Sequence, residues 1–316
     1  LVQWNNGHFM HQFTYFIGNV NFYYVDKNGK KQTAAMNTGD SMYITPFVPH
    51  TFATRNNSNS NGLILALTYG GKLTGEFQQE LASMSNLGQE FALDFSSTRS
   101  ASASLLRYNR EISTITLEEL SKRTNIPIDD LRSFELSSKK PSITELEKIA
   151  KSLSVNVRDL LPNDMIEEKV IVKMHEDCRS WYYPETKKYY KFFELATTTA
   201  LPFSKSFEVE ILDSNDPELD ICSGLHQYVY NIGKNKITLN WEINGKNNQE
   251  IIHPSDSLYM KPFIKHNFRG SGKLLILRVG GKIPGDSQRE LSIVGKENAE
   301  RAISETTLWF DNHGKN

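Results

Sequence analysis

Two segments of the chain repeat each other, and this internal repeat restricts the possible folds more than any single motif does. The sequence HQFTYFIG at residues 11–18 returns as HQYVYNIG at residues 226–233, and GDSMYITPFVPHTF at residues 39–52 returns as SDSLYMKPFIKHNF at residues 255–268. A third match joins residues 70–81 to residues 280–291, each opening with Gly-Gly-Lys and closing with Glu-Leu. One structural unit therefore occurs twice.

Each copy has the sequence character of β-structure. Short runs rich in Tyr, Phe, Val, Ile and Thr alternate with turn residues, and Asn28-Gly29 and Asn244-Gly245 stand where tight hairpin turns are expected. This spacing suits a small antiparallel barrel or a jelly roll. We therefore expect a mixed α and β fold, mainly β, with two antiparallel β-barrels.

The segment between the copies has helical signals instead. Thr116 with Glu119 and Ser142 with Glu145 are capping boxes, and Pro127 opens a further helix. Five short helices are expected within residues 101–162, and their order resembles the repressor-type helix-turn-helix fold. The predicted domains are a first barrel at residues 1–95, the helical module at 96–164 and a second barrel at 165–316. Strand-like sequence precedes only the second copy, so we expect the first barrel to lack an upstream part in this numbering.

The overall charge excludes a general attraction to polyanions. The chain has 36 Lys and Arg against 37 Asp and Glu, a net charge of -1, so an anion must be bound by a local site. The longest apolar stretches are much shorter than the roughly 18 residues that a membrane-spanning helix needs, and the N-terminus has no signal-peptide pattern. We expect a soluble, cytoplasmic protein that has no membrane partner.

The helical module shows little sign of DNA binding. A repressor-type fold would insert the helix that follows Pro127 into the major groove, yet this helix begins with Asp129 and Asp130. Residues 101–162 hold ten basic and nine acidic residues, whereas a DNA-binding face is normally strongly basic. Arg132 and the pair Lys139-Lys140 are the features in favour. We interpret the module as a helical scaffold, and a helix-turn-helix transcription regulator with a sensing barrel is the alternative.

The chemistry is expected in the first copy. Residues two and four apart in a strand point to the same face, so His8 and Gln12 project together, and His50 on a later strand can complete a face of three metal ligands. Taken singly, each such side chain is more often a packing residue than a ligand. The second copy keeps Gln227 and His266 but has Ser223 in place of the first histidine, so we expect no complete metal site there.

Three ligands on one face leave the opposite positions of an octahedral ion open for a chelating substrate and for dioxygen. Non-haem Fe(II) oxygenases have this arrangement, normally with two histidines and one carboxylate. With the neutral Gln12 as third ligand, the site has one more unit of positive charge, which favours a chelating dianion such as a phosphonate.

These residues and the order of the modules resemble one group of enzymes, the phosphonate oxygenases of the cupin superfamily. In hydroxyethylphosphonate dioxygenases a Glu ligand stands six residues before the distal His, and Ile44 holds that position here. Gln12, four residues after His8, is instead similar to the third ligand in the two-His-one-Gln iron site of methylphosphonate synthases. Gln12 and Ile44 are therefore the candidates for product-determining residues.

The resemblance implies a reaction and a substrate contact. A methylphosphonate synthase uses Fe(II) and O2 to cleave the C–C bond of 2-hydroxyethylphosphonate, and it releases methylphosphonate and CO2. By the same resemblance, Asn5 hydrogen-bonds the phosphonate, and the protein assembles as a homo-oligomer. No catalytic residue beyond the metal ligands is implied. The alternative within this class is a hydroxyethylphosphonate dioxygenase, which yields hydroxymethylphosphonate and formate.

Overall fold

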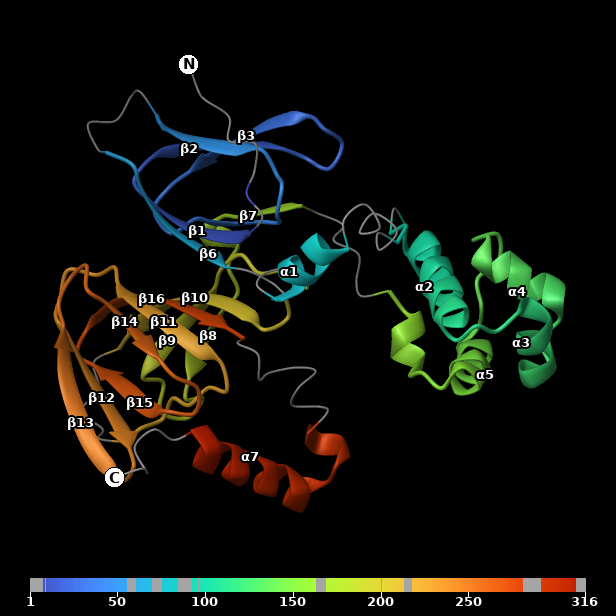
Figure 1. Ribbon diagram of the computed structural model, residues 1–316. Coiled ribbons are helices and arrows are strands. Elements are labelled where there is room, and N and C mark those ends of the chain that lie inside the picture. The colour runs from blue at the N-terminus through green and yellow to red at the C-terminus, as the bar shows by residue number, and fades with distance from the viewer. Residues whose placement is uncertain are drawn as a thin grey trace. The chain divides into compact units, whose positions relative to one another are not determined.

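The chain folds into a β-rich unit and a helical unit. The computed structural model describes residues 8, 10–55, 61–69, 76–84, 93–95, 97–162, 169–199, 201–212, 218–280 and 291–310. Leu1–Tyr69 and Val170–Asn316 form one compact unit, and Gly70–Lys169 forms the other (Figure 1). The fold is thus mixed α and β, and mainly β. No helix in the described part of the chain has the length and apolar character needed to cross a membrane.

The helical unit contains the five helices expected between the repeats. They are α2 (Thr98–Ile112), α3 (Leu117–Thr124), α4 (Ile128–Glu135), α5 (Ile143–Leu153) and the short 3-10 helix η2 (Val157–Leu160), and α1 (Glu76–Ser83) precedes them. Ser142 and Glu145 form the expected capping box of α5. Leu120, Ile126 and Phe134 are buried in one hydrophobic cluster, so local caps and apolar spacing account for this unit.

A partly buried ion pair joins two of these helices. The Nε and Nη2 atoms of Arg110 in α2 donate to the two carboxylate oxygens of Glu135 in α4, at 2.6 and 2.9 Å. The two side chains are only 13% and 9% exposed. This bidentate geometry between poorly solvated side chains makes the ion pair strong. Removal of Glu135 would therefore destabilise the protein, because the charge of Arg110 would remain poorly solvated.

We therefore expect Glu135→Ala to destabilise the helical unit by about 3 kcal/mol, because the poorly exposed guanidinium loses its bidentate partner and retains the longer, 3.6 Å ion pair with the exposed Glu111. Hydrogen–deuterium exchange of the full chain should report this as faster exchange in α2 and α4. The matched control is Glu119→Ala, which removes the exposed pair of Arg123 and Glu119 and should cost less than about 0.5 kcal/mol. Equal effects of the two substitutions would show that burial does not strengthen the Arg110 pair.

The first copy of the repeat is built from two facing sheets. Its strands are β1 (His11–Ile17), β2 (Val20–Val25), β3 (Lys31–Met36), β4 (Ser41–Ile44), β5 (His50–Thr54) and β6 (Leu63–Tyr69). One sheet has the order β6-β1-β4-β7 and the other the order β3-β2-β5. Phe16, Phe22 and Met42 are among the buried residues that fill the space between them.

The strand β7 (Val170–Lys173) completes the first copy although it follows the helical unit in sequence. It pairs antiparallel with β4, so that Ile44 lies opposite Val170 and Ser41 opposite Lys173. The sequence predicts this segment within the second copy, whereas its pairing with β4 puts it in a sheet of the first. The chain therefore returns to its first sheet after the helical insertion before it begins the second.

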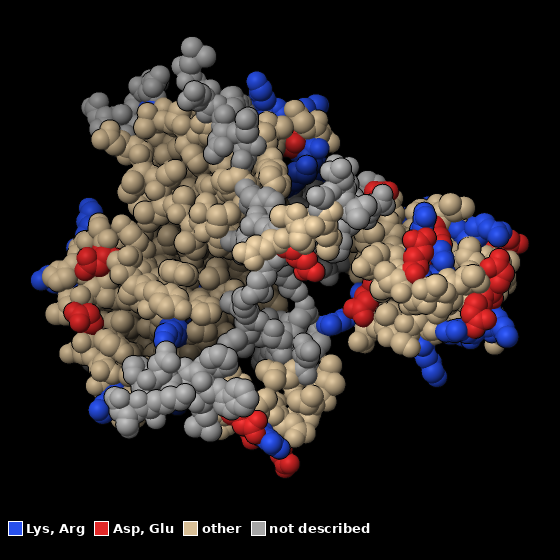
Figure 2. Space-filling model, in the orientation of Figure 1, with Lys and Arg blue, Asp and Glu red and all other residues tan. Residues whose placement is uncertain are grey.

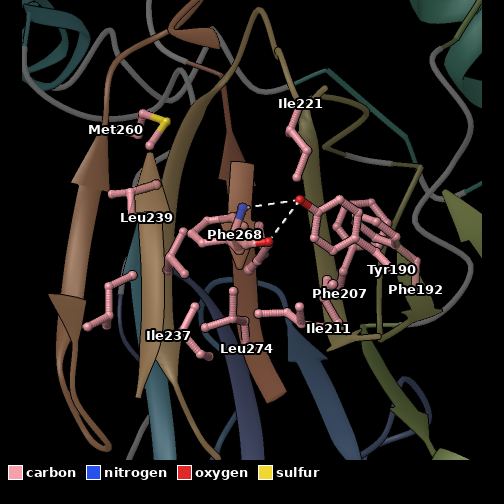
Figure 3. Close-up of a cluster of buried hydrophobic side chains, with 14 residues drawn as sticks. Tyr190, Phe192, Phe207, Ile211, Ile221, Ile237, Leu239, Met260, Phe268 and Leu274 are labelled. Carbon is pink, nitrogen blue, oxygen red and sulfur yellow. Dashed lines mark hydrogen bonds between the residues drawn. The ribbon is translucent and has the colours of Figure 1, made fainter. Parts of the chain in front are cut away.

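The second copy repeats this arrangement with additional strands. They are β8 (Ser180–Tyr183), β9 (Tyr190–Glu194), β10 (Ser204–Ile211), β11 (His226–Asn231), β12 (Ile237–Ile243), β13 (Lys246–Ile252), β14 (Ser257–Met260), β15 (Lys265–Arg269) and β16 (Gly272–Val279), and the helix α7 (Lys296–Phe310) follows. The sheets have the orders β14-β11-β16-β10-β9-β8 and β13-β12-β15. In the core, the hydroxyl of Tyr190 bonds both the N–H and the C=O of Phe268 and so links the two sheets (Figure 3).

The prediction of closed barrels is wrong. In the described part of the chain, each copy has two separately hydrogen-bonded, open sheets that face each other across a hydrophobic core. Alternation of apolar and polar residues is the same for a strand in a barrel and for one in a sandwich, because both bury one face. The sequence pattern therefore could not distinguish them.

The outer face of β1 packs against the second copy. Phe13 and Tyr15 lie in a buried cluster with Leu195 and Leu275. The hydroxyl of Tyr15 donates to the carboxylate of Glu208 at 2.6 Å, and the ammonium of Lys273 donates to the same carboxylate at 2.8 Å. Glu208 is only 1% exposed, so these two donors satisfy a carboxylate that would otherwise be costly to bury. With its outer face covered in this way, β1 turns its other face to the interior of the first copy.

Candidate metal centre

The three predicted ligands of the first copy come together at one end of its sandwich. His8 lies three residues before the start of β1 and not on a strand as predicted, Gln12 lies on β1, and His50 opens β5. The Nε2 atom of His8 lies 2.8 Å from the Oε1 atom of Gln12. The rings of His8 and His50 are perpendicular, with centroids 5.4 Å apart. Gln12 and His50 are nearly fully buried and His8 is half-buried, so the cluster is largely shielded from water.

The loop before β5 sets the orientation of His50. The Nδ1 atom of His50 lies 2.8 Å from the carbonyl oxygen of Val48, which requires the proton on Nδ1 and leaves the Nε2 lone pair for a metal ion. Phe47 has a positive φ of 63° and its N–H bonds the carbonyl of His8 at 2.9 Å. This loop therefore ties both histidine segments together.

The surroundings of His50 favour the neutral form of its imidazole, which is the form that binds metal ions. Burial lowers the pKa of His50 from its ordinary value; the hydrogen bond to Val48 opposes this shift, and the nearby His8 adds to it. A histidine must be unprotonated to bind a metal ion. His50 is therefore in the ligating form at neutral pH.

The donor set fits Fe(II). His8 Nε2 and Gln12 Oε1 lie within hydrogen-bond distance, 2.8 Å apart. Two donors that bind one first-row metal ion at about 2.1 Å and at right angles lie roughly 3 Å apart, so the same two atoms can reach one ion when Nε2 carries no proton. No group of three His, Cys, Asp or Glu side chains gathers anywhere in the described part of the chain. The third donor of this candidate site is therefore the amide oxygen of Gln12. Two imidazoles with one oxygen donor suit Fe(II).

The two candidates for product determination are neighbours across the sheet. Gln12 on β1 pairs directly with Ile44 on β4, and Ile44 is fully buried. Side chains at such opposed positions have Cβ atoms only about 5 Å apart. A ligand at position 44 would therefore approach the same space as one at position 12. Asn5, the expected phosphonate contact, lies outside the described residues.

The second copy keeps the frame of this site without the metal-binding set. The N–H of Phe263 bonds the carbonyl of Ser223, as that of Phe47 bonds His8, and the Nδ1 atom of His266 lies 2.9 Å from the carbonyl of Ile264. Burial, the largest cause, lowers the pKa of His266 to about 4. The guanidinium of Arg278 donates to Gln227 Oε1 at 2.8 Å, so an arginine cation occupies the place beside this amide.

One residue of the site was missed by the sequence analysis. The Nε2 atom of Gln12 donates to the hydroxyl of Thr14 at 2.9 Å, and Thr14 is fully buried. Strand periodicity could have drawn attention to it, because residues two apart share a face. In contrast, His11, the neighbour of Gln12 on β1, faces away from the site and bonds the hydroxyl of Tyr43.

Comparison with known proteins identifies a relative along the whole chain. No protein-family model matches. The methylphosphonate synthase of Nitrosopumilus maritimus (strain SCM1) is 61% identical over 316 residues, which are 100% of this chain and 69% of that protein.

Solved structures give a related picture. The HEPD of Streptomyces albus, with its substrate 2-hydroxyethylphosphonate and Fe(II) bound, superposes with a TM-score of 0.80 at 30% identity, over 95% of this chain and 69% of that one. A cadmium-containing PhpD complexed with hydroxyethylphosphonate has a TM-score of 0.75 at 19% identity, over 96% of this chain and 72% of that one, which supports the fold alone.

Proposed function

The chain belongs to the methylphosphonate synthase family, and on this premise we propose that His8, Gln12 and His50 are the ligands of its iron. The protein is an iron-dependent enzyme that cleaves the C–C bond of 2-hydroxyethylphosphonate and yields methylphosphonate and CO2. The observation that carries the ligand assignment is the 2.8 Å approach of His8 Nε2 to Gln12 Oε1 beside the ring of His50.

The three proposed ligands determine the net charge of the iron site and therefore the kind of substrate that it favours. When bound, Fe(II) supplies the redox chemistry, with O2 as the proposed co-substrate. All three protein ligands are neutral, so they leave the charge of a divalent ion to be balanced by the substrate. This favours a dianionic phosphonate that chelates through its hydroxyl and one phosphonate oxygen. The buried setting of Gln12 and His50 keeps bulk water from competing for these positions.

Asn5 is our proposed hydrogen-bond partner of the phosphonate. Gln12 and Ile44 are our candidates for the residues that set the product, because they lie opposite each other on β1 and β4. The alternative outcome at the same site is that of a dioxygenase, with hydroxymethylphosphonate and formate as products.

We propose further that each copy is an open form of the cupin fold and that the helices between them form a repressor-like module. The proposed domains are residues 1–95, 96–164 and 165–316, with the strand β7 of the last segment added to a sheet of the first copy. The repeated hydrogen bonds around Phe47 and Phe263 support a common origin of the two copies. The module's helices, in the order expected of repressors, support the second assignment. As in the family that it resembles, we expect the protein to be a homo-oligomer.

We interpret the helical module as a scaffold rather than a DNA-binding domain. Two of the cations that favoured DNA binding are paired with acidic side chains: Lys139 with Asp130 at 2.8 Å, and Arg132 with Asp129 at 2.9 Å. On the face in view, basic and acidic residues are interspersed over the module (Figure 2). Such a surface attracts a phosphate backbone weakly.

The test is turnover by the full-length protein after anaerobic loading with Fe(II). On addition of 2-hydroxyethylphosphonate and O2, we expect a methylphosphonate signal by phosphorus NMR, together with CO2. Hydroxymethylphosphonate as product would favour the dioxygenase alternative. A protein that retains no iron would contradict the proposed ligand set. A gel shift with DNA at low salt would then favour the alternative function, a helix-turn-helix transcription regulator.

A further inference from the structure

An amide ligand poses a problem of orientation that a carboxylate does not. Only the oxygen of a glutamine amide has lone pairs for a metal ion, whereas its NH2 group is a donor of two hydrogen bonds. Rotation of the amide by half a turn would present the wrong atom. The two oxygens of a glutamate are equivalent, so the same rotation would leave its ligand function intact.

The environment of Gln12 selects one orientation. Its Nε2 donates to the hydroxyl of Thr14 at 2.9 Å, and its Oε1 faces His8 Nε2 at 2.8 Å. Thr14 is fully buried and lies between Met42 and Ala66 on the neighbouring strands. A buried, β-branched side chain has few rotamers available, so the hydroxyl is a fixed acceptor for the amide nitrogen.

The second copy shows the same amide without this hydroxyl. Val229 holds the position that corresponds to Thr14, because each lies two residues after the glutamine on its strand. There the amide has different partners: Gln227 Oε1 accepts from Arg278, and Gln227 Nε2 lies 3.1 Å from His266 Nε2. In the strand register, Arg278 on β16 lies opposite Gln227 on β11, and Thr68 on β6 lies opposite Gln12 on β1. The same backbone position thus carries an amide whose hydrogen-bond partners differ between the copies, and the hydroxyl partner of the amide nitrogen is specific to the first copy.

We propose that Thr14 is a positioning residue that holds the amide of Gln12 with its oxygen toward the iron. This inference rests on the proposed ligand set. Without the hydroxyl, the amide nitrogen would be a buried donor that lacks its acceptor, and the amide would spend part of its time with the oxygen turned away from the histidines. Loss of a hydrogen bond that orients a metal ligand typically weakens metal binding about 10- to 100-fold.

The test compares Thr14→Val with Thr14→Ser in the full-length protein. Thr14→Val retains the shape of the side chain and copies the residue of the second copy, whereas Thr14→Ser retains the hydroxyl. We expect anaerobic titration with Fe(II) to show affinity about 10-fold or more weaker in Thr14→Val and within about 3-fold of the parent in Thr14→Ser. Thermal melting of the metal-free proteins checks that each variant is folded.

A second background separates orientation from simple packing. In Gln12→Glu the ligand has two equivalent oxygens, so adding Thr14→Val should change Fe(II) affinity by less than about 3-fold. A merely structural role of Thr14 predicts the same loss in both backgrounds, and that result would overturn the proposal. So would unchanged affinity in Thr14→Val while Gln12→Ala binds iron weakly. If Gln12→Ala itself binds iron as the parent does, the ligand set fails instead.

Discussion

Replacing His50 by alanine should abolish stable iron binding and, with it, turnover of 2-hydroxyethylphosphonate. His50 is nearly fully buried, and its hydrogen bond to the Val48 carbonyl leaves Nε2 as its ligating atom. We expect Fe(II) affinity to fall by more than about 100-fold, beyond the losses that follow removal of a mere supporting hydrogen bond. Iron content after anaerobic loading and desalting measures this directly.

The chain provides its own control for this substitution. His266 is the repeat counterpart of His50, equally buried and held in the same way by the carbonyl of Ile264. His266→Ala removes a buried imidazole from the second copy, so it should lower the melting temperature while one iron per chain remains. Full iron loading in a folded His50→Ala variant would show that His50 is not a ligand. Loss of iron in His266→Ala alone would place the metal in the second copy.

Moving the third ligand across the sheet should first remove and then restore the iron site. Gln12→Ala leaves two ligands, and we expect at least about 100-fold weaker Fe(II) binding. Adding Ile44→Glu to this variant places a carboxylate directly opposite position 12, where it can reach the same ion. Its negative charge offsets one unit of the ion's charge, so binding should recover fully or exceed that of the parent.

The metal-free form of this double variant provides a second measurement. Ile44 is fully buried, so a glutamate there is a costly charge until an ion pairs with it. We expect a lowered melting temperature that rises with added Fe(II), because a ligand that binds only the folded state stabilises it. A folded double variant that binds no iron would refute exchange of the ligand across the strands. Methylphosphonate as its sole product would show that neither position sets the product.

The sequence was sufficient for features that depend on local pattern. The repeat placed Gln12 and Gln227, and His50 and His266, at equivalent positions. Strand periodicity grouped His8 with Gln12, although His8 lies before β1 and not on it, and helix caps such as Ser142 with Glu145 located the helices. These features follow from the periods of 2.0 and 3.6 residues and from chemistry within one turn, which can be read along the chain.

Tertiary structure decided what depends on contacts between distant segments. Open sheets rather than barrels, the return of β7 to β4, and the burial of Glu208 by Tyr15 and Lys273 all depend on which strands pair and which faces meet. At the site, the cross-strand pairing of Gln12 with Ile44 depends on the register of β1 and β4, and the different hydrogen-bond partners of Gln12 and Gln227 depend on the packing around each amide. Apolar alternation specifies that one face of a strand is buried, but it does not specify which other strand or side chain covers that face. The sequence alone therefore determined the repeat and its candidate ligands. The tertiary packing determined which residues contact these ligands and how their side chains are held.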